Sequence, residues 1–446
     1  HQSGDYTPYL FESRDRGRSW SSITGDLPDD TIVWAVEQDH QRPELLFVGA
    51  ERGVHVTVDG GLSWHRLTKD MPTIAVRDLA IQRRDDDLVC ATFGRGFYVL
   101  DDFGPLRSIA DRIADKVALC PVRDAWWYVP YQPMQAVGQP TLGSTAFRTP
   151  NPEFGATFTY HLAADIESGR AARRTAEQAV GDRDDIGFPG WEVLRDERLE
   201  SPPAVVLRVT SADGAVVRML PAELGAGLHR TTWDLRVPAP DPVSLEAEPF
   251  RAPWDLPPVG DLAPPGRYTV DIVRLDGEAE VLAGPESFEV RPIPAVANSP
   301  SDDPDFRRRA ADLARRVAGA GEQIERLRVR LRHARATILR TPAATDLLGE
   351  VDAGTRALDD VATQLTGDAD RARLNEATTP SIRGLVGRVV RVHRDSTGPP
   401  TQTQRDAVDR ARRAFETVED RLAAVAADID ELTARLDDAG CPWSPR

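Results

Sequence analysis

The side chains in this sequence that could carry out chemistry are mostly carboxylates in short motifs. Asp15 and Asp59 stand in two copies of one pattern, and Asp101 and Asp102 follow each other directly. Two carboxyl groups on opposite sides of a sugar can hydrolyse a glycosidic bond. Such a site requires the two groups to face each other, so the first question is what each motif does to the backbone around it.

The repeated pattern reads Ser/Thr-x-Asp-x-Gly-x-x-Trp, and these residue types are those of a hairpin turn. The Asp carboxylate accepts hydrogen bonds from nearby backbone N–H groups, and Gly adopts a backbone angle that a residue with a Cβ resists. Trp supplies a large apolar plate to pack under the turn. We therefore predict a structural role for both copies. They are Ser13, Asp15, Gly17 and Trp20, and Thr57, Asp59, Gly61 and Trp64.

The two copies start at Ser13 and Thr57, which are 44 residues apart (57 − 13). This spacing matches one blade of a propeller, because repeats of four-stranded blades run about 40–45 residues. Strand patterns occur over residues 31–38, 45–50, 53–58 and 64–68, and a third unit without the motif follows over residues 76–100. We expect residues 1–105 to be the last blades of a β-propeller, which needs more blades than these to close. Because the chain begins in mid-blade, we expect it to be the C-terminal part of a longer protein, with further blades upstream.

These turns resemble the Asp-box, also called the BNR repeat. The run Phe93-Gly94-Arg95-Gly96-Phe97-Tyr98-Val99-Leu100-Asp101-Asp102 resembles the last blade of bacterial sortilin-like propeller proteins, which are often labelled glycosyl hydrolases. The resemblance implies that the box lies on the outer rim, away from the central channel where sialidases hold a Tyr nucleophile and an Arg cluster. It also implies ligand binding, since sortilin propellers bind peptides.

Five further residues are candidates for ligand binding. Arg95 follows a Gly at a strand entry, and Asp101 and Asp102 close the blade. We favour structural closure for these three, because a general acid would need a pKa raised by burial. Trp126 and Trp127 could stack on a sugar ring, but adjacent aromatic residues more often join two domains.

Neither a cofactor nor a metal site is expected. The His residues lack metal-ligand spacing, and Cys90, Cys120 and Cys441 form no C-x-x-C pair. We interpret Cys90 and Cys120 as buried free thiols, with a disulfide between them as the alternative. The acidic run over residues 182–185 is interpreted as a solvated loop, because it lacks the spacing and the Gly of a calcium-binding hand.

The net charge and the distribution of apolar residues limit which partners this chain is expected to bind. The formal net charge is −16, which argues against nucleic acid and against anionic membranes. The chain contains no apolar run of about 18 residues, so we expect no membrane span in this part of the protein.

Behind the propeller the sequence is first β and then α. Residues 106–149 are expected to be a connector. Residues 150–294 contain short strand patterns and the turn signals Ser211-Ala212-Asp213-Gly214 and Asp276-Gly277, which predict an immunoglobulin-like or fibronectin type III-like sandwich. Polar insertions interrupt it at residues 163–201 and 238–261.

Residues 301–440 switch to helical periodicity. Apolar residues recur in alternating steps of four and three along two long segments, which is typical of heptad seams. The first segment is rich in Arg and the last is acidic, so we expect an antiparallel, coiled-coil-like bundle with two shorter helices alongside. The seams are Phe306, Ala310, Leu313, Val317, Ala320, Ile324, Leu327, Leu331, Ala334 and Ile338, and Val408, Ala411, Phe415, Val418, Leu422, Val425, Ile429, Leu432 and Leu436.

Two functions are compatible with these patterns. The first is a non-catalytic scaffold that binds a protein, peptide or carbohydrate, with the upstream blades of the same protein as a further partner. The alternative is a sialidase-like glycoside hydrolase whose catalytic residues lie mainly in the upstream blades. We favour binding, because no stretch carries the residues of a sugar-cleaving site. Since such relatives are frequently exported, a secreted or cell-envelope location is favoured over the cytoplasm.

Overall fold

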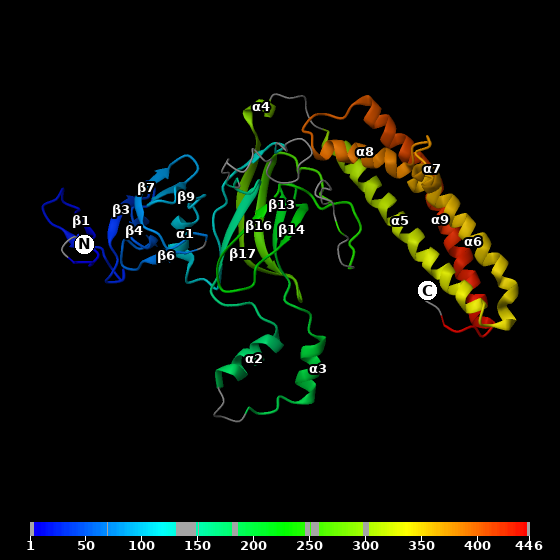
Figure 1. Ribbon diagram of the computed structural model, residues 1–446, viewed down its shortest axis with the longest axis horizontal. Helices are drawn as coiled ribbons and strands as arrows, with labels where there is room; N and C mark the ends of the chain where they lie inside the picture. Colours follow the sequence, from blue (N-terminus) through cyan, green and yellow to red (C-terminus); the bar gives the residue numbers. More distant parts are fainter. Residues whose placement is uncertain are drawn as a thin grey trace. The chain divides into compact units, whose positions relative to one another are not determined.

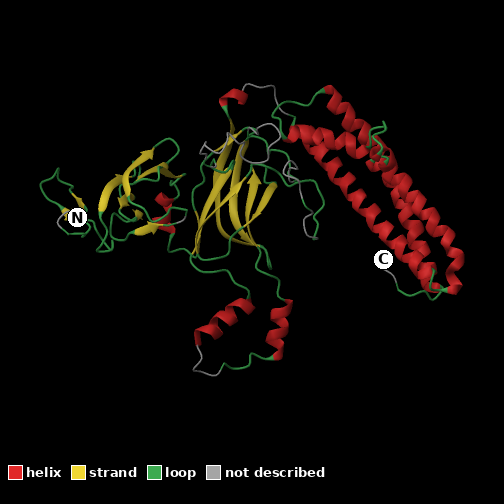
Figure 2. Ribbon diagram, in the orientation of Figure 1, coloured by secondary structure: helices red, strands yellow, loops and turns green. Residues whose placement is uncertain are grey.

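The computed structural model of the protein describes residues 4–68, 70–130, 149, 151–180, 186–245, 250, 258–297 and 303–443. Within them several antiparallel sheets are followed by a C-terminal helical region (Figures 1 and 2). The chain forms two compact units. The first unit is His1–Ala125, Asn151–Asp234 and Gly266–Val290, and the second unit is Trp126–Pro150, Leu235–Pro265 and Arg291–Arg446.

Three antiparallel sheets follow one another in the N-terminal part of the first unit. A two-stranded hairpin precedes a four-stranded meander in the order β3-β4-β5-β6 and a three-stranded meander in the order β7-β8-β9. The strands lie close to their expected positions. They are β1 Phe11–Glu12, β2 Ser21–Ser22, β3 Val33–Gln38, β4 Leu46–Ala50, β5 Gly53–Thr57, β6 His65–Leu67, β7 Val76–Gln82, β8 Asp87–Thr92 and β9 Phe97–Leu100.

The two meanders share one core. Side chains of β4 and β5 pack with side chains of β7 and β8, and the rings of Phe47 and Phe103 meet edge to face with centroids 5.1 Å apart. Burying such large aromatic and aliphatic side chains supplies most of the stabilisation between packed sheets. The core residues are Leu45, Phe47, Val54, Val56, Val76, Leu79, Leu88, Cys90 and Phe103.

Two further sheets pack against each other through aromatic side chains. Phe158 meets Phe288 with centroids 5.6 Å apart, and Trp233 meets Tyr268 at 5.3 Å. The sheets have the strand orders β10-β12-β15 and β11-β17-β16-β13-β14. Their strands are β10 Val117–Leu119, β11 Ala125–Trp127, β12 Ala156–Leu162, β13 Val205–Ser211, β14 Val216–Pro221, β15 Gly227–Trp233, β16 Gly266–Arg274 and β17 Glu280–Pro292.

The expected connector over residues 106–149 is more than a linker. It contains helix α1 (Leu106–Arg112), and its strands β10 and β11 join the three-stranded and the five-stranded sheet. Each strand is only three residues long, which is too short for periodicity to reveal. The insertion at residues 163–201 also has structure, since it contains helices α2 (Gly169–Val180) and α3 (Trp191–Leu199).

The helical region follows the short helix α4 (Pro294–Ala297), and its heptad seams are confirmed. Every seam residue of α5 is buried, and so is every seam residue of α9 except Val425, which is partly buried. Helix α5 begins with Asp303, whose side chain accepts a hydrogen bond from Phe306 N, and α9 begins with a capping box of Thr401 and Gln404. The elements are α5 Pro304–Ile338, a 3₁₀ helix Pro342–Leu347, α6 Leu348–Thr366, α7 Ala369–Arg373, α8 Ile382–Arg394 and α9 Gln402–Asp438.

The expected antiparallel pairing of the two long helices is wrong. Residue numbers rise together along the ion pairs that join α5 or its cap to α9, so α5 and α9 run parallel (Figure 1). These pairs are Asp303–Arg405, Arg316–Glu419 and Arg330–Asp430.

The returning arm of the bundle explains this orientation. Arg328 pairs with Asp359 and Arg335 with Asp352, so α6 runs antiparallel to α5. Helix α8 continues in the same direction, because Arg307 near the start of α5 donates to His393 O at the end of α8. The 19 residues of α6 and the 13 of α8 act as one broken helix, and α9 then runs beside α5 in the original direction.

Candidate functional site

The second copy of the repeated pattern is a closed hydrogen-bonded turn between β5 and β6, and we call the two copies the Asp-box turns after the motif that they resemble. Asp59 Oδ1 accepts from the backbone N–H groups of Leu62 and Ser63, each at 3.0 Å, and from Thr57 Oγ1 at 2.6 Å. Asp59 Oδ2 accepts from the Ser63 hydroxyl, and Gly61 N donates to Thr57 Oγ1 at 3.0 Å. Both oxygens of the Asp59 carboxylate therefore accept hydrogen bonds from residues of its own turn.

The first Asp-box has the same hydrogen bonds. Asp15 Oδ1 accepts from Arg18 N at 2.9 Å, from Ser19 N at 2.8 Å and from Ser13 Oγ at 3.0 Å, and Gly17 N donates to Ser13 Oγ at 2.6 Å. The Ser19 hydroxyl donates to Asp15 Oδ2 at 2.8 Å. The two carboxylates thus occupy separate turns and bond only to their own turns, which is not the geometry of a pair that faces one sugar.

The two box tryptophans differ in burial. Trp64 is 7% exposed, its Nε1 donates to Ile23 O at 3.2 Å and its backbone N donates to Asp26 Oδ1 at 2.6 Å. Trp20 is 64% exposed, so only the second copy has a buried tryptophan, and that ring packs against Leu27 and Ile23 of the segment after the first copy. A longer repeat signals this contact: Ile23-Thr24-Gly25-Asp26-Leu27-Pro28 after the first box matches Leu67-Thr68-Lys69-Asp70-Met71-Pro72 after the second.

Stability at low pH is expected to depend on Asp59. Burial raises its pKa, but hydrogen bonds from Ser63, Thr57 and Leu62 outweigh this and lower the pKa to about 2. Because the folded pKa lies below the unfolded value, this stabilisation is present above about pH 4 and is lost as the pH falls toward 2. Asp59→Ala should lower the free energy of unfolding by about 1–3 kcal/mol at pH 7, measured by urea unfolding.

The same measurement has a matched control in Asp29→Ala. Asp29 is exposed and no side-chain hydrogen bond holds it in a turn, so its replacement should leave stability unchanged at both pH values. A variant Asp59→Ala that keeps the parent's full loss of stability between pH 4 and pH 2 would contradict the assigned cause.

Asp101 and Asp102 lie at the end of β9 and contact Arg230. Arg230 Nη1 donates to Asp101 O at 2.9 Å and Nη2 donates to Asp102 O at 2.6 Å. Burial raises the pKa of both carboxyl groups, and nearby Asp87 adds to the effect at Asp101. Arg95 is not part of this cluster, since it lies exposed in the β8–β9 turn at the other end of the strand.

Trp126 and Trp127 point in different directions, as successive residues of a strand do. Trp127 is buried and its Nε1 donates to Ala263 O at 2.8 Å, whereas Trp126 is exposed. The buried ring joins parts of the second unit, so stacking on a ligand is open to Trp126 alone.

Three further expectations concern metals, thiols and membranes. Among the described residues no group of three or more His, Cys, Asp or Glu side chains could hold a metal ion, and no helix there is long and apolar enough to cross a membrane. Cys90 and Cys120 are buried free thiols, and burial raises the pKa of Cys90 to about 11. The acidic run at residues 182–185 lies outside the described residues.

A hollow between the two meanders brings together residues that the sequence analysis missed. The guanidinium carbon of Arg77 lies 3.6 Å from the centroid of the Trp34 ring, and Trp34 Nε1 donates to Glu51 Oε2 at 2.8 Å. Arg77 Nη2 lies 3.6 Å from the same Glu51 oxygen. This stack of an indole, a guanidinium and a carboxylate is held by cation–π and charge-assisted contacts. The lining is Tyr6, Asp30, Ile32, Trp34, Glu51, Arg52 and Arg77.

An exposed aromatic side chain lies beside Arg77 of this hollow. The Arg77 guanidinium carbon is 5.3 Å from the ring centroid of Phe93, which is 70% exposed, and Phe97 at the start of β9 is 74% exposed. Arg52 forms an ion pair with Asp30 at 2.6 Å. The hollow measures about 480 Å³, within the usual range for ligand pockets. We call these residues, together with the hollow, the strand-start site.

Sheet register explains why these residues meet. Val33 at the start of β3 pairs with Ala50, and Val76 at the start of β7 pairs with Thr92. The turns after β4 and β8 therefore lie beside the starts of β3 and β7. The Asp-box turn follows β5 and lies at the opposite end, as does the end of β9. The sequence signal is that Trp34 and Arg77 are both the second residue of the first strand in a meander.

Comparisons with known proteins assign no family. No protein-family profile matches the chain, and no curated protein matches it. Solved structures with similar segments include the extracellular domain of a putative one-component system from B. thetaiotaomicron, at 11% identity, a TM-score of 0.17 and coverage of 65% of this chain and 31% of that chain.

Two more solved structures are of the same kind. PorZ, a surface component of the type-IX secretion system of Porphyromonas gingivalis, is 11% identical at a TM-score of 0.16, with 58% of this chain and 30% of that chain covered. The extracellular domain of a putative hybrid two-component system from B. thetaiotaomicron is 8% identical at 0.18, with 63% and 29% covered. The chain spans less than a third of the length of these structures, and TM-scores this low carry no assignment of fold or function.

Proposed function

We propose that this protein is a non-catalytic binding scaffold and that the strand-start site binds a peptide segment of its ligand. One observation carries the proposal. Exposed aromatic side chains and arginines gather at the end of the two meanders where β3 and β7 begin. Trp, Tyr and Arg dominate the residues that contribute most to protein and peptide recognition.

The proposal includes the architecture of an Asp-box propeller. Meander sheets that pack in succession, with an Asp-box turn between the third and fourth strand, support this interpretation. In a propeller the first strands β3 and β7 would line the central channel, so the strand-start site would lie at its mouth. The two facing sheets behind the meanders support an immunoglobulin-like or fibronectin type III-like sandwich.

The exposed Trp20 supports the further blades in this proposal. Trp64 packs on the segment from Ile23 to Leu27, which follows the preceding box. By the same rule Trp20 would pack on the corresponding segment of another blade. A secreted or cell-envelope location belongs to the same proposal and depends on the Asp-box resemblance alone.

A peptide suits this site better than a sugar as ligand. Phe93 and Phe97 present rings without a polar group, and such rings match apolar side chains. Each arginine in the lining has an acidic neighbour, Arg52 with Asp30 and Arg77 with Glu51, so the site does not call for an anionic ligand.

Glycoside hydrolysis is not proposed. Burial raises the pKa of the carboxyl groups of Asp101 and Asp102, but both residues lie at the opposite end of the sheets, where Arg230 donates to their backbone carbonyl oxygens. At the strand-start site Asp30 and Glu51 are both engaged with arginine, whereas a general acid has to be neutral when substrate binds.

Selection from a phage-displayed random peptide library tests the proposal. Enriched peptides are synthesised and titrated into the full chain by calorimetry. Arg77→Ala and Phe93→Ala should each weaken binding by about 30-fold or more, because truncating a central aromatic or Arg anchor typically costs 2 kcal/mol or more.

Arg84→Ala is the matched control, since Arg84 is an exposed arginine in the β7–β8 turn at the opposite end of the sheets. It should leave the affinity unchanged. Enriched peptides whose affinity survives both Arg77→Ala and Phe93→Ala, or a selection that enriches none, would overturn the proposal.

A further inference from the structure

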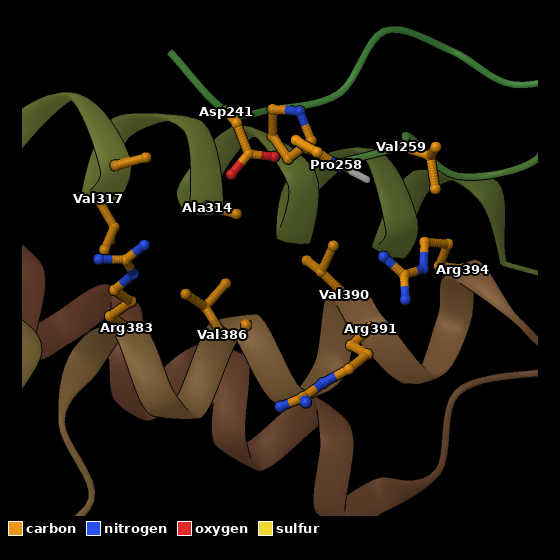
Figure 3. Close-up of a pocket in the computed structure, with 13 residues that line it drawn as sticks. Asp241, Pro258, Val259, Ala314, Val317, Arg383, Val386, Val390, Arg391 and Arg394 are labelled. Carbon is orange, nitrogen blue, oxygen red and sulfur yellow. The ribbon is translucent and has the colours of Figure 1, made fainter. Parts of the chain in front are cut away.

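A second hollow lies within the second unit, between two helices of the bundle and the ends of a loop. Figure 3 shows Val386 and Val390 of α8 facing α5, with Asp241 and Pro258 of the loop beyond. We call residues 237–241 and 258–261 the loop feet. The hollow measures about 190 Å³. Its lining is Pro240, Asp241, Pro258 and Val259 from the loop feet, Ala314, Val317 and Ala318 from α5, and Arg383, Val386, Gly387, Val390, Arg391 and Arg394 from α8.

The loop feet are fixed against α8. Arg236 Nη1 donates to Gly260 O at 2.9 Å and to Arg394 O at 3.0 Å, and Val237 N donates to Asp261 O at 3.0 Å. A Cβ on Gly260 would lie 2.1 Å from Val237 O, so only glycine permits this close approach of the two feet. The wall of the hollow that the loop provides is therefore preorganised.

The charge at this hollow is unbalanced. Helix α8 carries Arg383, Arg388, Arg391 and Arg394 and no acidic residue, in a chain whose net charge is −16. Three of these four arginines line the hollow, and the acidic residue in the lining is Asp241. Just beyond the helix, Asp395 forms an ion pair with Arg394 at 3.5 Å.

Arg394 is placed to receive a ligand group. Its side chain is only 15% exposed, and its Nε is buried without a hydrogen-bond partner. The nearest carboxylate to that atom, of Asp395, lies at 3.5 Å without forming a hydrogen bond. Figure 3 shows the guanidinium extending along the hollow toward Val390. The donors that a bound acceptor can reach are therefore the terminal nitrogens of this guanidinium rather than the buried Nε.

We propose that this hollow binds a short amphipathic carboxylate. The valines and alanines of α5 and α8 contact its apolar chain, and the Arg394 guanidinium binds the carboxylate, with Arg383 and Arg391 adding positive potential. The ligand should be small, because the volume of the hollow is below the roughly 300–1,000 Å³ of pockets for drug-sized ligands. The site is separate from the strand-start site and does not depend on the function proposed there.

Hexanoate is the probe, titrated into the full chain by calorimetry and by the methyl shifts of Val386 and Val390. Acetate tests the need for the apolar chain, and hexylamine tests the need for negative charge. We expect saturable binding of hexanoate only. Arg394→Gln should weaken it about tenfold or more, as loss of a charge-assisted hydrogen bond does. Arg388→Gln is the matched control, because Arg388 belongs to the same helix but not to the lining.

A second variant guards against a folding defect in Arg394→Gln. Val390→Glu places a carboxylate in the hollow and should abolish binding, while circular dichroism checks that both variants keep the helical signal of the parent. The proposal is overturned if hexanoate shows no saturable binding, if hexylamine binds equally well, or if Arg394→Gln leaves the affinity unchanged. Binding of an acidic peptide at this hollow without binding of hexanoate would also overturn it.

Discussion

Replacing Arg107 with alanine is expected to lower the free energy of unfolding of the two meanders by about 3–5 kcal/mol. Arg107 of α1 donates to both oxygens of Asp39, each at 2.8 Å, and to both oxygens of Asp86, at 2.6 and 2.7 Å. The Asp39 side chain is 0% exposed. Without the guanidinium, a fully buried carboxylate would keep its desolvation cost and lose its partner.

These contacts tie three separate segments together. Asp39 lies in the β3–β4 turn, Asp86 in the β7–β8 turn and Arg107 in α1, while Arg42 donates to Arg107 O and pairs with Asp111 at 2.8 Å. Burial alone would raise the pKa of Asp39, but hydrogen bonds from Arg107 and from backbone N–H groups lower it. The network should therefore weaken as the pH falls below the ordinary range of an Asp carboxyl group.

Hydrogen exchange at the backbone amides of β3 to β9 is the measurement for Arg107→Ala. It gives the stability of these strands separately from that of the rest of the chain. Arg84→Ala provides the control, since the Arg84–Asp85 pair is a surface pair in which Arg84 is highly exposed, and such pairs contribute little. Protection in Arg107→Ala that stays within 1 kcal/mol of the parent would refute the role of the network.

The two box tryptophans should respond very differently to the same truncation. Trp64→Ala is expected to lower the free energy of unfolding by about 3–5 kcal/mol, as large-to-small replacements of buried aromatic residues do. Trp64 packs with Leu10, Leu27 and Val33 and donates its Nε1 to Ile23 O. Its removal leaves both a cavity and an unpaired carbonyl.

Trp20→Ala should change stability by less than about 0.5 kcal/mol, as expected for a largely exposed side chain. Urea unfolding of both variants against the parent gives the comparison. Equal losses at the two positions would contradict the difference in packing.

Features governed by neighbouring residues could be predicted well. The Asp-box turns have their hydrogen bonds within seven residues of chain, and strands β3 to β9 are bounded by local turn signals. The heptad seams of α5 and α9 were also predictable, because a helix buries the same face wherever its partner lies.

Features that depend on distant contacts were not predictable in this way. The length and charge of two helices leave open whether they run parallel, and α5 and α9 are parallel because α6 and α8 together return the chain along their full length. In the same way, strands β10 and β11 are too short to give a periodic sequence pattern. They are defined by their pairing with neighbouring strands in the sheets.

The candidate sites also differ in whether they depend on local or on distant contacts. Sequence alone determined that Asp15 and Asp59 belong to turns, because a carboxylate two residues before Gly is satisfied by the next few N–H groups. Only the tertiary structure brought Trp34 beside Arg77 and Glu51, and Arg394 beside the loop feet. Strand register, sheet packing and helix direction set those distances, and each is a contact between segments far apart in the chain.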